Sequence, residues 1–314
     1  MWNGRRQVGE GMRARLWAVG LSAFAVASLA LGAPVAASAA GGDTVPDAVI
    51  HHVVDGNDIA FQHPLTGSTV TLVLPQFKIT LGGVEIDLSI TRHLLIMWVA
   101  AAVLVLVITL AARRRSLVPR GLYSMIEMVV TFIRDELARK NFGTKEEADR
   151  WVPFLATAFF FIFILNLFGL IPYSATATGN IAVTAGLALI TFILTLYAGM
   201  RAQGVVGYFA HIVPQGVPIW LYPIMLPVEI LGLFTKPFAL AVRLFANMVA
   251  GGFVIYFLIG LIFMLGEGVA PLVAPVSVAF GAAMILLKLF VAFLQAYIFT
   301  MLSALFIGMS AHPH

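Results

Sequence analysis

Residues 223–252 read PIMLPVEILGLFTKPFALAVRLFANMVAGG, and this stretch indicates both the class of protein and the place of its chemistry. Its side chains are almost all apolar, but three of the exceptions are charged: Glu229, Lys236 and Arg243. They are spaced seven residues apart, which is close to two helical turns, so a helix places them on one stripe. Asn247 follows Arg243 by four residues and extends that stripe towards the C-terminus.

The apolar region around this stripe is too long for one upright membrane helix. As a helix, residues 223–265 would extend about 64 Å, whereas the hydrocarbon core of a bilayer is about 30 Å thick. The same holds for residues 274–309, and Gly- and Pro-containing residues 266–271 separate the two segments. We therefore predict a hairpin of two long, tilted or kinked helices over residues 223–309, followed by a short tail, 310–314.

The composition of the whole chain indicates a membrane protein. Hydrophobic residues make up 61% of the 314 residues, charged residues make up 11%, and the mean hydropathy is +0.97. Soluble domains carry about 25% charged residues. The net charge of +4 is unevenly distributed and is interpreted as a topology signal, with no nucleic-acid partner expected. The chain has no cysteine, which excludes disulfides and thiolate metal ligands.

Three further spans precede the hairpin. Residues 93–112 form the first predicted transmembrane helix, which ends at a run of three arginines and therefore at the cytoplasm. Residues 152–200 read as a pair of transmembrane helices joined by an uncharged turn. Arg201 then marks a cytoplasmic loop, 201–222. The fold class is thus an all-α membrane protein with about five to six membrane helices.

A different pattern occupies residues 113–151, where apolar residues at helical spacing alternate with charges. We predict a cytoplasmic amphipathic helix lying at the membrane interface, followed by a charged loop. The apolar face of that helix comprises Leu122, Ile126, Val129, Ile133 and Leu137.

The N-terminal part is expected to lie on the opposite side of the membrane. Residues 1–39 combine an arginine-rich start, an apolar run and an A-x-A site, which predicts a signal peptide; an uncleaved anchor is the alternative. Residues 40–92 form a more polar extracytoplasmic segment. Its alternating residues predict short strands near Thr69–Leu74 and Lys78–Ile90.

Arg243 is the strongest candidate functional residue. A charge at the centre of a bilayer costs about 2.5–3.5 kcal/mol on insertion scales. Glu229 lies about 21 Å away along a straight helix and cannot pair with it. A guanidinium does not lose its proton in a protein, so Arg243 would not carry protons itself. It would instead repel protons and favour ionisation of a carboxylate brought beside it.

The second long helix offers polar partners for this stripe. Lys288 and Gln295 are also seven residues apart, and in an antiparallel hairpin Gln295 and Arg243 lie at comparable distances from the turn. Gln295 would then offer the guanidinium a neutral acceptor. Simpler explanations remain open: Lys236 snorkels to the headgroups, Gln295 only joins two helices, and Glu229 merely lies near a helix end.

Three runs resemble the subunit a family of F-type ATP synthases: PFALAVRLFANMVAG at 237–251, FLQAYIF at 293–299 and NLFGLIP at 166–172. The resemblance implies that Arg243 is the stator arginine facing the c-ring carboxylate. It implies that Asn247 and Gln295 line its surroundings and that Glu229 lies in a cytoplasmic exit path. Implied partners are the c-ring proteolipids, the peripheral-stalk b subunits and the other synthase subunits. The implied location is the bacterial inner membrane, with a cytoplasmic C-terminus, and no cofactor or metal is expected.

Two positions depart from the pattern of many bacterial members. Gly252 stands where those members carry an acidic residue, and Lys288 stands where they carry His or Glu. Both positions belong to the outer half-channel in those members, so the residues of ion entry stay open. Lys288 is retained as a path residue that acts through its charge or by titrating.

The alternative function is a secondary transporter that binds an anionic substrate at Arg243. Such transporters often show inverted repeats, and none is evident in this sequence. The sequence also lacks a G-x-x-x-x-G-K-[ST] run, so ATP chemistry would take place on other subunits. The sequence does not decide between H⁺ and Na⁺ as the translocated ion, and the proton is expected.

Overall fold

The computed structural model describes the backbone of residues 58–62, 69–73, 78–81, 84–87, 89, 91–113, 121–171, 176–210, 219–264 and 270–311. The predicted signal peptide at 1–39 lies outside these residues. So do the turn at 266–268 and the part of the predicted cytoplasmic loop at 211–218.

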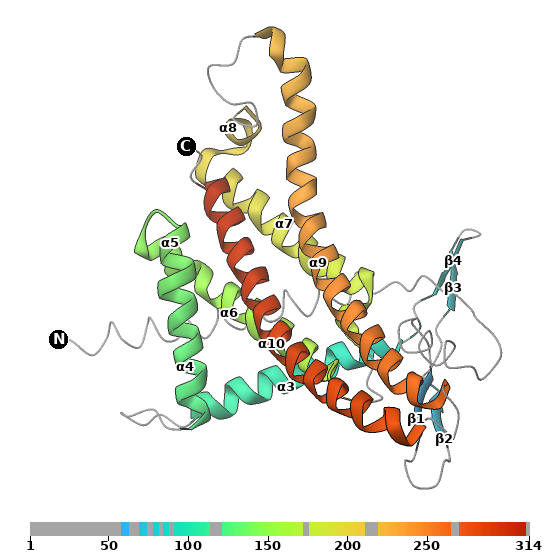
Figure 1. Ribbon diagram of the computed structural model, residues 1–314. Helices are drawn as coiled ribbons and strands as arrows, with labels where there is room; N and C mark the ends of the chain where they lie inside the picture. The colour runs from blue at the N-terminus through green and yellow to red at the C-terminus, as the bar shows by residue number, and fades with distance from the viewer. Residues whose placement is uncertain are drawn as a thin grey trace.

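Five long helices dominate the described residues (Figure 1). They are α3 (Arg92–Arg113), α6 (Lys145–Phe168), α7 (Ile181–Gln203), α9 (Tyr222–Met264) and α10 (Ala270–Ala311). Each is long and apolar enough to cross a membrane. This confirms the all-α membrane fold, and the bounds of α3 differ from the predicted 93–112 by one residue at each end.

Helices α9 and α10 form the predicted antiparallel hairpin (Figure 1). They comprise 43 and 42 residues, and both are assigned as continuous helices despite internal prolines. Pro227 and Pro237 lie within α9, and Pro275 lies in the second turn of α10. Helix α7 packs against both members of the hairpin, and α6 packs against α10. The hairpin is therefore supported along part of its length by the shorter helices.

The segment before α3 contains two small antiparallel strand pairs. Strand β1 (Asp58–Gln62) pairs with β2 (Thr69–Val73), and β3 (Lys78–Leu81) pairs with β4 (Val84–Asp87). These strands agree with the alternation seen in the sequence around residues 69–74 and 78–90.

The predicted amphipathic helix consists of three consecutive pieces: α4 (Leu122–Phe132), a π-helix (Ile133–Ala138) and α5 (Arg139–Asn141). Leu122 is exposed, Ile126 and Val129 are half-buried, and only the π-helical part buries its apolar residues fully. The wider π-helical turn, with its i→i+5 hydrogen bonds, lets the neighbours Leu137 and Ala138 both face the core. This amphipathic element, residues 122–141, is thus anchored through its C-terminal half.

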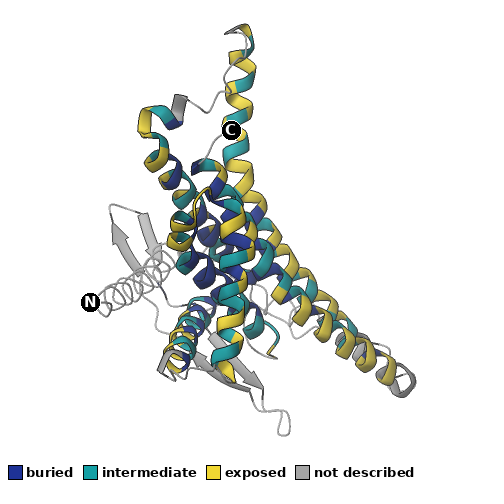
Figure 2. Ribbon diagram, turned by 90° about the vertical axis from the view of Figure 1, so that its left-hand side faces the viewer, coloured by how far each residue is buried: buried dark blue, intermediate teal, exposed yellow. Residues whose placement is uncertain are grey.

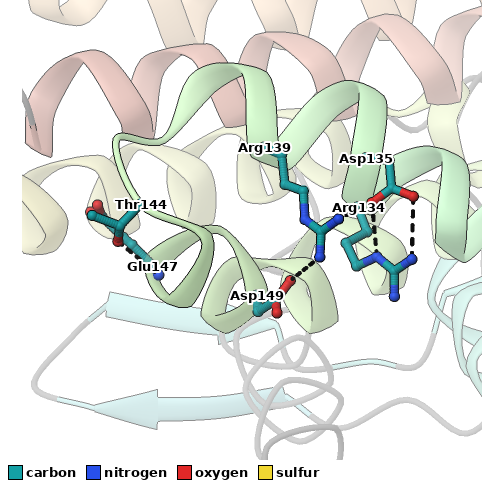
Figure 3. Close-up of polar contacts among 6 residues, drawn as sticks. All are labelled: Arg134, Asp135, Arg139, Thr144, Glu147 and Asp149. Carbon is teal, nitrogen blue, oxygen red and sulfur yellow. Dashed lines mark hydrogen bonds and ion pairs between the residues drawn. The ribbon is translucent and has the colours of Figure 1, made fainter.

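An ion-pair network crosses from this element to the start of α6 (Figure 3). Asp135 accepts hydrogen bonds from Arg134 at 3.0 and 3.2 Å and from Arg139 at 2.7 Å, and Arg139 also lies 3.7 Å from Asp149. The Arg134 guanidinium, aided by Arg139, holds the pKa of the Asp135 carboxyl below its usual value. Thr144 caps α6 by accepting a hydrogen bond from the Glu147 backbone N–H.

The core is formed by residues of α3, the π-helix, α6, α7, α9 and α10, and the outer faces of the long helices are exposed in the isolated chain (Figure 2). Buried polar groups join its elements. The Thr178 hydroxyl donates to the Asn166 side-chain oxygen at 2.9 Å, and the Asn166 amide donates to the Ala292 carbonyl at 3.5 Å. These bonds connect α6 to α10 and to the short 3₁₀ turn before α7.

Candidate functional site

The charged stripe predicted from the sequence lies on one continuous helix, α9. Arg243 is exposed on the outer face of the bundle, whereas Leu240 and Leu244 on the same turn are buried. Within the described part of the chain, no hydrogen bond or ion pair reaches the Arg243 side chain. A guanidinium that leaves its own bundle in this way requires water or another protein surface to balance its charge.

Asn247 and Gln295 meet across the α9–α10 interface. The Asn247 side-chain amide donates a 2.7 Å hydrogen bond to the Gln295 side-chain carbonyl. Gln295 is 1% exposed, and its Nε2 has no hydrogen-bond partner in the described part of the chain. Among the described residues the Gln295 carbonyl accepts from Asn247, one turn further along α9, and no hydrogen bond joins Gln295 to Arg243, so a contact between those two side chains stays a prediction.

Lys288 lies seven residues before Gln295 on α10, about two helical turns away along the same α9–α10 interface. Its side chain is 8% exposed and packs over Gly251, where an added Cβ would lie 3.0 Å from Lys288 Cε. Gly252, the next residue, has open space within 4 Å of an added Cβ. Gly251 thus leaves the room that the lysine occupies inside the hairpin.

Glu229 and Lys236 line a pocket of about 210 Å³ at the other end of the stripe. Helices α7, α9 and α10 and the short helix α8 (Val205–Ala210) form its walls. The Lys236 amine stands over the Phe306 ring, 5.7 Å from its centroid, which is a cation–π arrangement. Lys236 is therefore an exposed residue whose amine also contacts α10 through the Phe306 ring.

Several polar pocket residues were not singled out from the sequence. They are Thr191, Thr195, Gln203, Tyr208 and Ser310. Thr191 and Thr195 are four residues apart on an apolar helix, and this spacing was the available signal. The described residues bring together no group of three His, Cys, Asp or Glu side chains that would hold a metal ion.

These features define a multi-pass membrane protein with an outward-facing arginine between two polar regions of a long helical hairpin. The model of the ATP synthase A chain family matches residues 94–308. The chain belongs to the ATP synthase A chain family.

Relatives called ATP synthase subunit a are similar over most of the chain. The protein of Anaeromyxobacter dehalogenans strain 2CP-C is 53% identical over 276 residues, covering 85% of this chain and 70% of the relative. That of Myxococcus xanthus is 59% identical over 235 residues, covering 73% and 76%. That of Chloroherpeton thalassium is 50% identical over 266 residues, covering 83% and 75%.

Proposed function

We propose that this chain translocates protons as the stator of the membrane sector of an F-type ATP synthase, with Arg243 as its essential charge. The observation that carries the proposal is the exposure of Arg243 on the outer face of α9, without a partner in the described part of its own chain. An unpaired guanidinium at that depth suits a moving carboxylate on a neighbouring subunit, which it would force to ionise. The c-ring proteolipids supply such a carboxylate in this proposal.

Two polar regions on either side of Arg243 would serve as the half-channels. Glu229 lies about 21 Å from Arg243 along the helix, at the far side of a pocket whose lining extends to Leu240, and Gly251, which packs against Lys288, lies about 12 Å away in the opposite direction. Asn247 and Gln295 lie between Arg243 and Lys288. A permanent positive charge between two water-filled paths repels protons and so blocks a direct leak between them.

The side of each path follows from the charges of the chain. Arg201 at the end of α7 favours the cytoplasm for the pocket of Glu229. The C-terminus of α10 then lies on the same side, as expected for a bacterial inner-membrane protein. Exposed apolar residues of the hairpin, including Phe238, Leu286 and Phe290, would contact lipid or the ring. The peripheral-stalk b subunits and the rest of the synthase would complete the assembly.

The direct test is Arg243→Ala in inverted membrane vesicles that hold the whole synthase. We expect loss of ATP-driven proton pumping while ATP hydrolysis by the soluble sector continues. Arg201→Ala is the matched control, because Arg201 is an exposed cation of α7 whose side chain contacts Tyr197 of the same helix at 3.2 Å. Coupled pumping that survives in the Arg243 variant would remove the proposal.

A further inference from the structure

The pocket of Glu229 holds one polar atom that the fold leaves unsatisfied. The Gln203 side-chain amide donates a 2.8 Å hydrogen bond to the Ser310 carbonyl, at the C-terminal end of α10. Its Oε1 is buried and has no hydrogen-bond partner among the residues that the structure describes. Buried acceptors in proteins are nearly always paired, and the usual partner where protein groups are absent is ordered water.

Two hydroxyl groups of the same lining, those of Thr195 and Ser310, are also left as acceptors. The Thr195 hydroxyl donates to the Thr191 carbonyl at 2.8 Å, and the Ser310 hydroxyl donates to the Thr195 carbonyl at 2.9 Å. Their hydrogens are therefore used within the backbone, and their oxygens remain free to accept. Glu229 adds a carboxylate to the same lining. The acceptors beside Gln203 suit molecules that donate hydrogen bonds, and the Lys236 ammonium adds donors to the same lining. Water can donate and accept, and the volume of about 210 Å³ has room for several waters.

The placement of Gln203 connects Glu229 with the end of the bundle. Gln203 is the last residue of α7, and Gly204, with φ of 76°, turns the chain into α8. Tyr208 of α8 and Ser310 of α10 both pack on Gly199, where an added Cβ would lie 2.4 Å from each. Figure 1 shows α8 beside the C-terminal end of α10. The three elements thus line the pocket at the end that faces away from Arg243.

We propose that Gln203 is a positioning residue of the ion path, whose Oε1 holds the water that passes protons between Glu229 and the aqueous phase beyond α8. This inference rests on the function proposed above. Gln203 orders the hydrogen-bonded water next to Glu229 and does not itself take up the proton. Its amide hydrogen on the Ser310 carbonyl fixes the orientation of the side chain and leaves the buried oxygen as the acceptor without a partner.

The test measures passive proton flux through the membrane sector in vesicles from which the soluble sector has been stripped. Gln203→Leu removes the acceptor and keeps the bulk, and we expect the flux to fall by about fivefold, the effect of one net hydrogen bond. Gln203→Glu keeps an acceptor and, when protonated, a donor to Ser310, so we expect flux close to that of the parent. Thr109→Val is the matched control, because that hydroxyl bonds only to carbonyls of its own helix α3.

A cysteine variant decides the matter if the leucine variant fails to assemble. The chain has no cysteine of its own, so Gln203→Cys provides a single thiol. We expect silver ions, which react with thiolates in water, to block flux in this variant and to leave Ile193→Cys unaffected, because Ile193 is exposed on α7 away from the pocket. Normal flux in assembled Gln203→Leu, equal loss in Gln203→Leu and Gln203→Glu, or a silver-resistant Gln203→Cys would overturn the inference. If Arg243→Ala abolishes pumping while these results fail, only the role of Gln203 falls.

Discussion

Asn247 of α9 and Gln295 of α10 are joined by a 2.7 Å hydrogen bond across the long hairpin, with Gln295 almost completely buried. This bond connects the helix that carries Arg243 to the C-terminal helix. Because Asn247 uses the carbonyl of Gln295, the Gln295 amide is left with hydrogens to donate, directed into the interface. The pair therefore sets the distance between the two helices one turn beyond Arg243.

We expect Asn247→Leu to destabilise the hairpin, because it leaves the buried Gln295 carbonyl unpaired, which costs about 1–3 kcal/mol. The double variant Asn247→Leu/Gln295→Leu should be less destabilised than the sum of the two single variants, since both polar partners are then gone. Thermal unfolding of the detergent-purified complex measures each variant. Strictly additive effects would show that the two side chains do not interact.

Gly308 of α10 is expected to tolerate no larger residue, because an added Cβ would fall 2.0 Å from the Asn141 carbonyl oxygen. Gly308→Ala should therefore push α5 away from α10 and weaken the packing of the amphipathic element, residues 122–141, against the bundle. Gly232→Ala is the matched control, since that helical glycine has nothing within 4 Å of an added Cβ. Alanine is otherwise favoured over glycine in helices by about 0.5–1 kcal/mol. Limited proteolysis between α4 and α6 reports the difference, and equal cleavage in both variants would contradict it.

The ion pairs of Asp135 in the amphipathic element, residues 122–141, should be broken by acid only at low pH. Arg134 lowers the pKa of Asp135, so the stability gained from this carboxylate is present above the unfolded-state pKa, near 3.9, and is lost as the pH falls through the still lower folded-state value. We expect proteolysis of the element to be unchanged between pH 7 and 5 and to increase below about pH 4. Asp135→Asn should remove this pH dependence. An onset of cleavage near pH 6 would point to a different group.

The sequence predicts the helices of this fold well and their mutual rotation poorly. The apolar runs locate α3, α9 and α10 to within a few residues, because the bilayer fixes the length of a spanning segment. Helical spacing also places Glu229, Lys236, Arg243 and Asn247 on one stripe. It does not say how a neighbouring helix is rotated about its own axis. For that reason Gln295 was expected beside Arg243 and is found on Asn247, one turn away.

The pocket and the π-helix show the same limit. Thr195, Gln203 and Ser310 come from α7 and α10, more than a hundred positions apart in sequence, and only packing brings them together. The π-helix at 133–138 depends on burial of adjacent residues against α6 and α10, which periodicity does not reveal. The departures at Gly252 and Lys288 were visible in the sequence. The space that Gly251 leaves for Lys288 became evident only from the packing.

Lys288 is expected to set the pH range of proton-driven ATP synthesis, if the interface of α9 and α10 forms the entry path. A positive charge beside that path lowers the pKa of any proton-binding group near it, so its removal raises those values and keeps the groups protonated at higher pH. Lys288→Ala should therefore shift the profile of ATP synthesis against pH towards higher pH. Synthesis driven by an imposed pH gradient in inverted vesicles measures this profile.

Variants of two neighbouring glycines, Gly251 and Gly252, test whether the position of the Lys288 charge matters when the charge itself is kept. Gly251→Val would place side-chain atoms against Lys288, whose Cε lies 3.0 Å from the added Cβ position, and should displace the amine and alter the profile as well. Gly252→Val has open space around the added side chain and leaves the Lys288 amine in place, so it should change the profile less than Gly251→Val in the same assay. The two variants add the same side chain to adjacent residues of α9. A loss of assembly caused only by the added bulk is therefore expected in both variants, whereas displacement of Lys288 is expected in Gly251→Val alone. An unchanged profile in both Lys288→Ala and Gly251→Val would place ion entry elsewhere on the chain.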